Sequence, residues 1–208
     1  TTAIIITIIS YFHQNQLPIY DINLAAKFIL NKQKSNDFGK ISKALGYEPT
    51  DKLLIIHADD VGLCKSVNTA TFESFKNKSI SSAAVMLTTS EIDEAARFSI
   101  DNPNFDMGIH LTVTSEWKNH KWGGVLKKDD IGSILNSNNH LYWNKRKFTK
   151  HGRLDEIRKE LQAQIDLGIS MGFNPSHIDS HEGALFFDPE IFKLYPVSYT
   201  HLRAHETV

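Results

Sequence analysis

Three short segments of this chain place acids and histidines at the ends of apolar runs that are typical of buried strands. They are residues 57–62 (His-Ala-Asp-Asp-Val-Gly), 108–112 (Gly-Ile-His-Leu-Thr) and 177–181 (His-Ile-Asp-Ser-His). A continuous apolar run predicts a strand that is buried on both faces of a parallel sheet. Because parallel strands end at one edge of a sheet or barrel, where sites are built, we expect the three segments to converge in space.

The rest of the pattern alternates strands and helices. We expect strands over 53–57, 82–87, 105–111 and 176–180, and helices over 67–78, up to residue 100, over 154–171 and from residue 189. This order predicts a parallel α/β sheet with right-handed crossovers. The long excursion 112–152 is rich in Trp, Asn, Lys and Gly, and a loop of that length is more typical of a lid or binding element than of a connector.

Composition and charge limit the classes of partner that the chain is expected to bind. The chain has 208 residues, a formal net charge of −1 and no long basic run, so nothing in it favours a nucleic-acid partner. One cysteine, Cys64, excludes a disulfide within the chain and is silent about compartment.

The N-terminal lead-in, residues 1–50, is polar and weakly patterned apart from an apolar run over 1–9. That run is too short to span a bilayer, so no stable membrane insertion is expected. It suits the remnant of a secretory signal, or equally a strand or the tail of a truncated reading frame. Localisation is therefore left open between cytoplasmic and exported.

The C-terminal segment 197–207 resembles, residue for residue, one reading frame of a transposase sequencing adapter. We therefore expect residues 196–208 to be a non-native tail. His201 and His205 have the i, i+4 spacing of two metal ligands on a helix, but both lie in this tail, so they are not included in the expected site. The expected catalytic domain is then residues 51–195, and it is partial.

The polar residues at the strand ends suggest a metal site. One Asp and two His leave coordination positions free on a divalent ion, which is typical of catalytic rather than structural sites. Alternatives remain for each segment: adjacent aspartates also occur in turns and helix caps, a lone histidine in the core, and alternating polar residues on one strand face. The three segments together favour the site.

These motifs carry a resemblance. The segments Leu-Leu-Ile-Ile-His-Ala-Asp-Asp-Val-Gly-Leu, Gly-Ile-His-Leu-Thr and Ser-His-Ile-Asp-Ser-His resemble the YdjC-like carbohydrate deacetylases, relatives of the polysaccharide deacetylases, over residues 45–195. The resemblance implies a distorted (β/α) barrel, TIM-barrel-like and here incomplete at the C-terminus. It also implies metal-dependent removal of acetyl groups from N-acetylated sugars or oligosaccharides.

The resemblance also implies roles for individual residues. Asp59 corresponds to the general base, and Asp60, His110 and His181 to the ligands of one divalent ion, with magnesium and zinc not distinguished. His177 and Asp179 correspond to residues that support the ligands or contact the substrate. His57 stands where family members often carry Asn, and no ligand role is assigned to it.

Several alternatives stay open. Trp117 and Trp122 could stack on sugar rings, or pin the long loop to the barrel. A metal-dependent amidohydrolase or phosphoesterase on the same fold is a second enzyme reading, and a carbohydrate-binding α/β domain is a non-catalytic one. Asp59 distinguishes an enzyme from the carbohydrate-binding domain, because a binding domain needs no second carboxylate beside the metal ligand. The general acid is expected in a missing C-terminal part, and the oligomeric state is not predicted.

Overall fold

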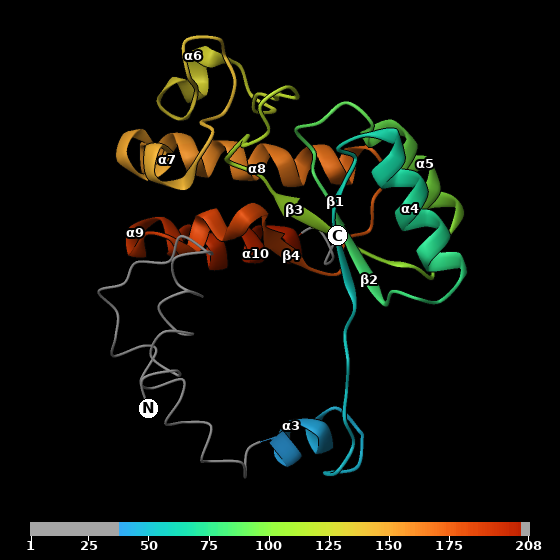
Figure 1. Ribbon diagram of the computed structural model, residues 1–208. Helices are drawn as coiled ribbons and strands as arrows, with labels where there is room; N and C mark the ends of the chain where they lie inside the picture. The colour runs from blue at the N-terminus through green and yellow to red at the C-terminus, as the bar shows by residue number, and fades with distance from the viewer. Residues whose placement is uncertain (1–37, 205–208) are drawn as a thin grey trace, which may run out of the picture. The chain divides into compact units, whose positions relative to one another are not determined.

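The computed structural model describes residues 38–204 (Figure 1). The chain divides into two units between Leu54 and Ile55, and helix α3 (Phe38–Ala44) belongs to the first. The expected leader over 1–9 lies outside the described residues, as does His205. The division into a lead-in, a catalytic domain and a non-native tail therefore stays a prediction.

The second unit contains a sheet of four parallel strands. They are β1 (His57–Val61), β2 (Ser82–Val85), β3 (Asp106–Leu111) and β4 (Ile178–Ser180), in the order β1-β2-β3-β4. Helices connect successive strands, as the alternating sequence pattern predicts. The parallel α/β class is thus confirmed, whereas closure of the sheet into a barrel stays a prediction.

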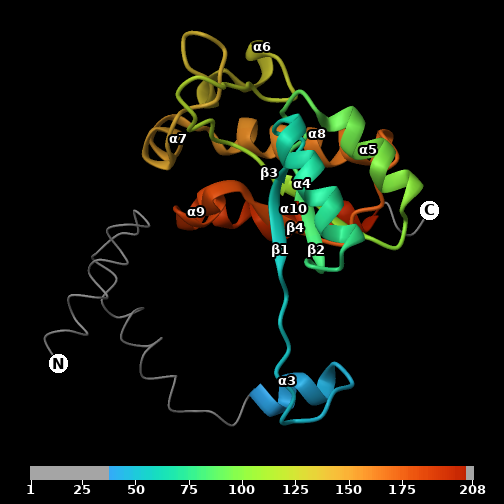
Figure 2. The same cartoon turned by 45° about the vertical axis from the view of Figure 1, so that its right-hand side comes forward.

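The helices cover the sheet in two groups (Figures 1 and 2). Helix α4 (Lys65–Lys76) packs against β1 and lies beside α5 (Ile92–Asp101). Helix α8 (Leu154–Ser170) packs against β3 and lies beside α10 (Leu194–Ala204), which follows the short α9 (Pro189–Phe192). Residues 197–204 of the adapter-like segment thus lie in α10. Among residues 38–204, no helix has both the length and the apolar composition that spanning a bilayer requires.

Apolar packing fixes the helices on the strands. The central strands β2 and β3 are buried along nearly their whole length, as continuous apolar runs predict. Between α4 and α5, the rings of Phe72 and Phe98 stack with centroids 3.8 Å apart, and Phe75 stacks on Phe105 at 4.8 Å. Ile157, Leu161 and Ile165 form the fully buried stripe of α8.

The first strand differs from its prediction. The expected strand over 53–57 is wrong, because β1 begins at His57 and the apolar run before it is solvent-exposed, with Leu54 at 78 % and Ile55 at 77 %. The carbonyl oxygen of Ile56 accepts a hydrogen bond from the Ser81 N–H at 2.9 Å, but no regular ladder precedes His57. No described element covers this apolar run, and apolar composition alone does not reveal whether a run is covered.

Strand β1 contains a bulge shortly after its first residue. Ala58 pairs with Ala83 and Val61 with Val85, so three steps along β1 match two along β2. Asp60 has a φ of 62°, a left-handed conformation that aspartate tolerates better than most residues. Successive side chains of a regular strand point to opposite faces, and a bulge re-aims them. The two aspartates therefore lie within an irregular strand rather than after it.

The long excursion after β3 is anchored by two buried polar residues of α8. It contains α6 (Lys128–Ile131), the 3-10 turn η1 (Gly132–Ile134) and α7 (Lys145–His151). Glu160 accepts hydrogen bonds from the N–H groups of Val125 (2.8 Å) and Leu126 (3.0 Å). Gln164 bonds both the N–H and the carbonyl of Thr112. These contacts hold the start and the middle of the loop over α8.

We expect the Glu160→Ala substitution to lower the free energy of unfolding by about 1–3 kcal/mol, because it leaves two partly buried N–H groups without an acceptor. Urea denaturation measures the change. Glu73→Ala is the matched control: Glu73 is an exposed residue in the interior of α4, and its ion pair among the described residues is with the exposed Lys76, so its loss should cost less than about 1 kcal/mol. Equal losses for the two variants would contradict the anchoring role.

Candidate metal centre

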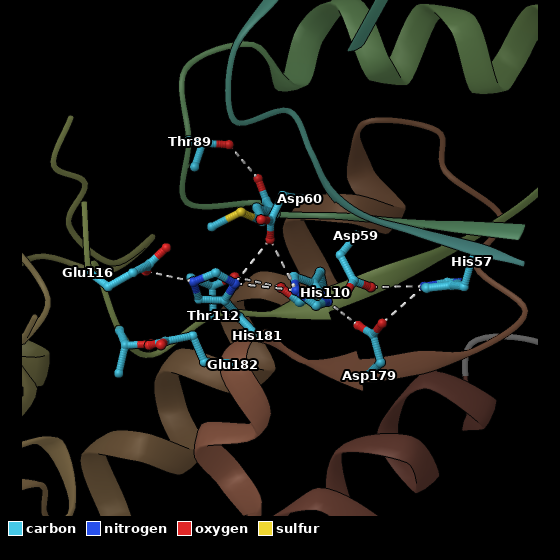
Figure 3. A network of polar contacts seen from close by, with 12 residues as sticks. His57, Asp59, Asp60, Thr89, His110, Thr112, Glu116, Asp179, His181 and Glu182 are labelled. Carbon is cyan, nitrogen blue, oxygen red and sulfur yellow. Dashed lines mark hydrogen bonds and ion pairs between the residues drawn. The ribbon is translucent and has the colours of Figure 1, made fainter. Parts of the chain in front are cut away.

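Three buried or half-buried side chains from distant parts of the chain present one ligand atom each to a common point (Figure 3). Asp60 Oδ1 lies 3.0 Å from His181 Nδ1 and 3.3 Å from His110 Nε2, and the two nitrogens are 3.3 Å apart. Both histidines are only 3 % exposed. These are the three residues expected as metal ligands, and the structure brings them together.

The spacing of these atoms fits a divalent cation. Nitrogen and oxygen ligands lie about 2.1 Å from such an ion, so two ligands are about 3.0 Å apart at a right angle and about 3.4 Å apart at the tetrahedral angle. The three observed separations fall within this interval. Two imidazoles and a carboxylate suit zinc and several other divalent metals, so the donor set does not select one.

Carboxylates hold both histidines from behind. His110 Nδ1 bonds Asp179 Oδ1, and His181 Nε2 lies 2.9 Å from Glu116 Oε2 (Figure 3). A carboxylate accepts, so each of these outer nitrogens donates, and the inner nitrogen keeps its lone pair for a cation. Asp179 and Glu116 thus set the orientation in which the two imidazoles face Asp60.

The charges of the cluster are strongly coupled. Burial alone would lower the pKa of His110, but hydrogen bonds to Asp179 and Asp60 raise it to about 9. For His181, burial is likewise outweighed by Asp60 and Glu116, and its pKa is also about 9. Burial acts to raise the pKa of Asp60, yet its bonds to the two histidines hold that pKa well below its usual range. Without an ion, protons therefore occupy the positions that a cation would take.

The strand register and the chain after β1 position these groups. His110 and Asp179 are register partners on β3 and β4, and His181 opens the 3-10 segment η2 (His181–Phe186) directly after β4. After Asp60 the chain turns at Gly62, whose φ is 90°. The N–H of Gly62 donates to Asn68 Oδ1 at 2.7 Å, and its carbonyl accepts from Thr89 Oγ1 at 2.7 Å. Both polar atoms of the turn are therefore held by buried side chains.

The second aspartate belongs to a neighbouring group. Asp59 Oδ1 lies 3.4 Å from His57 Nε2, which is 3.1 Å from Asp179 Oδ2, and the side chain of Asp59 is 61 % exposed. Strands β1 and β4 have β2 and β3 between them, a separation of about 14 Å in a flat sheet. Contact between His57 and Asp179 therefore requires the sheet to curl strongly, so that β1 and β4 approach each other on the face that carries these two side chains.

The remaining expected residues lie apart from the three ligand atoms. The His177 ring covers Gly108, where a Cβ atom would come within 2.4 Å of it, and its Nδ1 lies 2.8 Å from Ser176 Oγ. The ring meets His57 edge-on at a centroid distance of 5.2 Å. His177 thus borders the His57 side of the site and does not reach Asp60.

The two tryptophans have different surroundings. Trp122 is 5 % exposed, donates from Nε1 to the Thr114 carbonyl at 2.9 Å, and meets the His181 ring at 6.0 Å. That placement fits the alternative in which it pins the loop. Trp117 is 52 % exposed, so its ring is free to contact a ligand, and its stacking role stays a prediction.

Of the residues that hold the two histidines, the sequence analysis named Asp179 but not Glu116. The bond of Glu116 to His181 follows from the path of the loop after β3. Asn68 and Thr89 carry no motif. Glu182 accepts from Thr114 Oγ1 at 3.0 Å beside the same histidine. The one sequence signal was proximity, since Glu116 follows His110 by six residues.

Comparison with known proteins identifies a family and several relatives of this chain. The family model of the YdjC-like protein matches residues 53–198. A carbohydrate deacetylase of Geobacillus stearothermophilus is 34 % identical over 61 % of this chain and 48 % of its own. A chitooligosaccharide deacetylase of Yersinia enterocolitica is 34 % identical over 69 % of this chain and 54 % of its own. The chain thus spans about half the length of these curated relatives.

A solved structure is similar in fold. A protein of Enterococcus faecalis, provisionally named a cellobiose-phosphate cleavage protein, superposes with a TM-score of 0.65 at 25 % identity, over 73 % of this chain and 57 % of its own.

We expect the chain to bind one equivalent of Zn²⁺, and His110→Ala or Asp60→Ala to weaken that binding at least about 10-fold, because each removes one of three ligand atoms. Isothermal titration calorimetry on metal-free protein measures the affinity. His140→Ala is the control, since His140 lies outside the cluster in the loop before α7. Unchanged affinity in the first two variants would refute the site.

Zinc affinity and stability should respond to pH in opposite directions. Zn²⁺ must displace the protons held by His110 and His181, so its affinity should rise between pH 6.5 and 9. Without metal, the folded state binds more protons than the unfolded state in this interval, because unfolded histidine titrates near 6.5. The free energy of unfolding of the metal-free protein should therefore fall as pH rises from 6.5 to 9. Calorimetric titrations and urea melts at both ends of the interval test this.

Proposed function

The chain belongs to the YdjC-like protein family, and from this premise we propose that it is a metal-dependent carbohydrate deacetylase. The reaction is hydrolysis of an N-acetyl group on a sugar: a water oxygen bonds to the acetyl carbon, the carbon–nitrogen bond breaks, and acetate and an amine leave. The substrate class is supported by the names of the relatives, carbohydrate and chitooligosaccharide deacetylases.

The observation that carries the proposal is that the adjacent residues Asp59 and Asp60 have different surroundings. Asp60 meets His110 and His181 as a half-buried ligand, whereas the carboxylate of Asp59 stays exposed and outside that group. A divalent ion held by the three ligand atoms supplies a Lewis acid that polarises a carbonyl and acidifies water. Asp59 is then placed to accept a proton from the attacking water at its carboxylate.

The other residues orient these groups. Asp179 and Glu116 hold the outer nitrogens of the two histidines, which fixes their tautomers without placing a further charge on the substrate side. Trp117, exposed in the long loop, is the proposed sugar-stacking ring.

The test is acetate release from N-acetylglucosamine oligomers, measured with and without added Zn²⁺ or Mg²⁺. We expect metal-dependent release by the unmodified chain. Asp59→Asn should lower it by about 100-fold or more while Zn²⁺ affinity changes little, because the carboxamide cannot accept the proton and is not a ligand. His110→Ala should lose both properties. Asp101→Asn, a substitution at an exposed residue of α5, is the control.

Other outcomes would point elsewhere. If Asp59→Asn releases acetate at the rate of the unmodified chain, the assignment of Asp59 as base is wrong. Phosphate release from a sugar phosphate in place of acetate would favour the phosphoesterase reading. Binding of the oligomer with no release of either product would favour a carbohydrate-binding domain.

A further inference from the structure

His57 lies where two carboxylates and a hydroxyl approach one imidazole. Its Nδ1 is 2.6 Å from Ser82 Oγ, and its Nε2 is 3.1 Å from Asp179 Oδ2 and 3.4 Å from Asp59 Oδ1 (Figure 3). Ser82 is the register partner of His57 on β2, so the ring is fixed to the sheet from its other side. The imidazole is thereby oriented toward both acids.

The tautomer of this imidazole follows from its neighbours. Both groups near Nε2 are carboxylates, which only accept, so Nε2 carries the hydrogen. Nδ1 then accepts from the Ser82 hydroxyl, which can donate or accept. The Nε2–H group donates to Asp179 Oδ2, and Asp59 Oδ1 lies 3.4 Å from the same nitrogen, within ion-pair distance but without a hydrogen bond. Among residues 38–204, His57 is the one ion-pair partner of Asp59.

A donor at this position has a physical purpose. The ligand-bearing atoms of His57, Asp59 and Asp179 all lie within 4.8 Å of one another, so the two carboxylates are close enough to repel. Asp179 is held by His110, but Asp59 sits at the bulge with an exposed side chain and has several rotamers open to it. Without this donor, repulsion would turn Asp59 away from the ligand group.

We propose that His57 is a positioning residue that holds the carboxylate of Asp59 in its working orientation, by electrostatic attraction between that carboxylate and the Nε2–H group that His57 donates to Asp179. This inference rests on the proposed function, because it concerns the orientation of the proposed base. The ring itself contacts neither the three ligand atoms nor the space between them.

Three substitutions separate the contacts of the ring. His57→Gln can keep a donor near the Nε2 position, His57→Asn reaches only Ser82, and His57→Ala keeps neither. We expect kcat for acetate release to fall by about 10- to 100-fold for Asn and Ala and by less than about 3-fold for Gln. KM and Zn²⁺ affinity should change by less than about 3-fold in all three. A kcat for His57→Asn equal to that of the unmodified chain would overturn the proposal.

A measurement without activity keeps the two proposals separate. In ¹H–¹⁵N spectra of metal-free protein, His57, identified by its loss in His57→Gln, should show the tautomer protonated at Nε2. Asp59→Asn should shift that nitrogen, and Asp101→Asn should not. If no acetate is released yet this pattern holds, the proposed function fails while the contact stands. If acetate is released and His57 is protonated at Nδ1, the contact fails while the function stands.

Discussion

The structure of the site depends on one attraction, that of a single carboxylate oxygen of Asp60 for two imidazoles from other parts of the sheet. Asp60 comes from the first strand, His110 from the third, and His181 from the residue after the fourth. Because the outer nitrogen of each imidazole is held by its own carboxylate, the inner nitrogens both face Asp60 and lie 3.3 Å from each other. Three strand ends are thereby drawn to one point.

The bulge in β1 makes this convergence compatible with two adjacent acids. In a regular strand, Asp59 and Asp60 would face opposite sides of the sheet. The left-handed conformation of Asp60 and the turn at Gly62 bring both to the same side, and Asn68 and Thr89 satisfy the polar groups of that turn. The local irregularity is therefore supported by helix α4 and by the chain after β2, through side chains that bond the turn just after Asp60.

Much of this was predictable from the chain, and the failures have physical reasons. The parallel order of strands and the meeting of Asp60, His110 and His181 follow from apolar runs that end in polar residues, because parallel strands end at a common edge. The start of β1 was predicted wrongly, because composition does not reveal which surfaces neighbouring elements cover. The partners Glu116 and Glu160 were not predictable, since each acts through a loop whose path depends on tertiary contacts.

The sequence by itself determined the α/β class, because strand order is a local pattern, and it placed three polar segments at one edge of the sheet. The resemblance of those segments to the YdjC-like family then named Asp60, His110 and His181 as the residues expected to meet there. Only the tertiary structure decided how the two aspartates differ. The register shift in β1 and the curl of the sheet place Asp60 against two histidines and Asp59 against His57. The contact of Asp59 with His57 lies within β1. The contacts of Asp60 with the two histidines, and of His57 with Asp179, join residues that the chain separates by about 50 to 120 positions, and no local pattern records them.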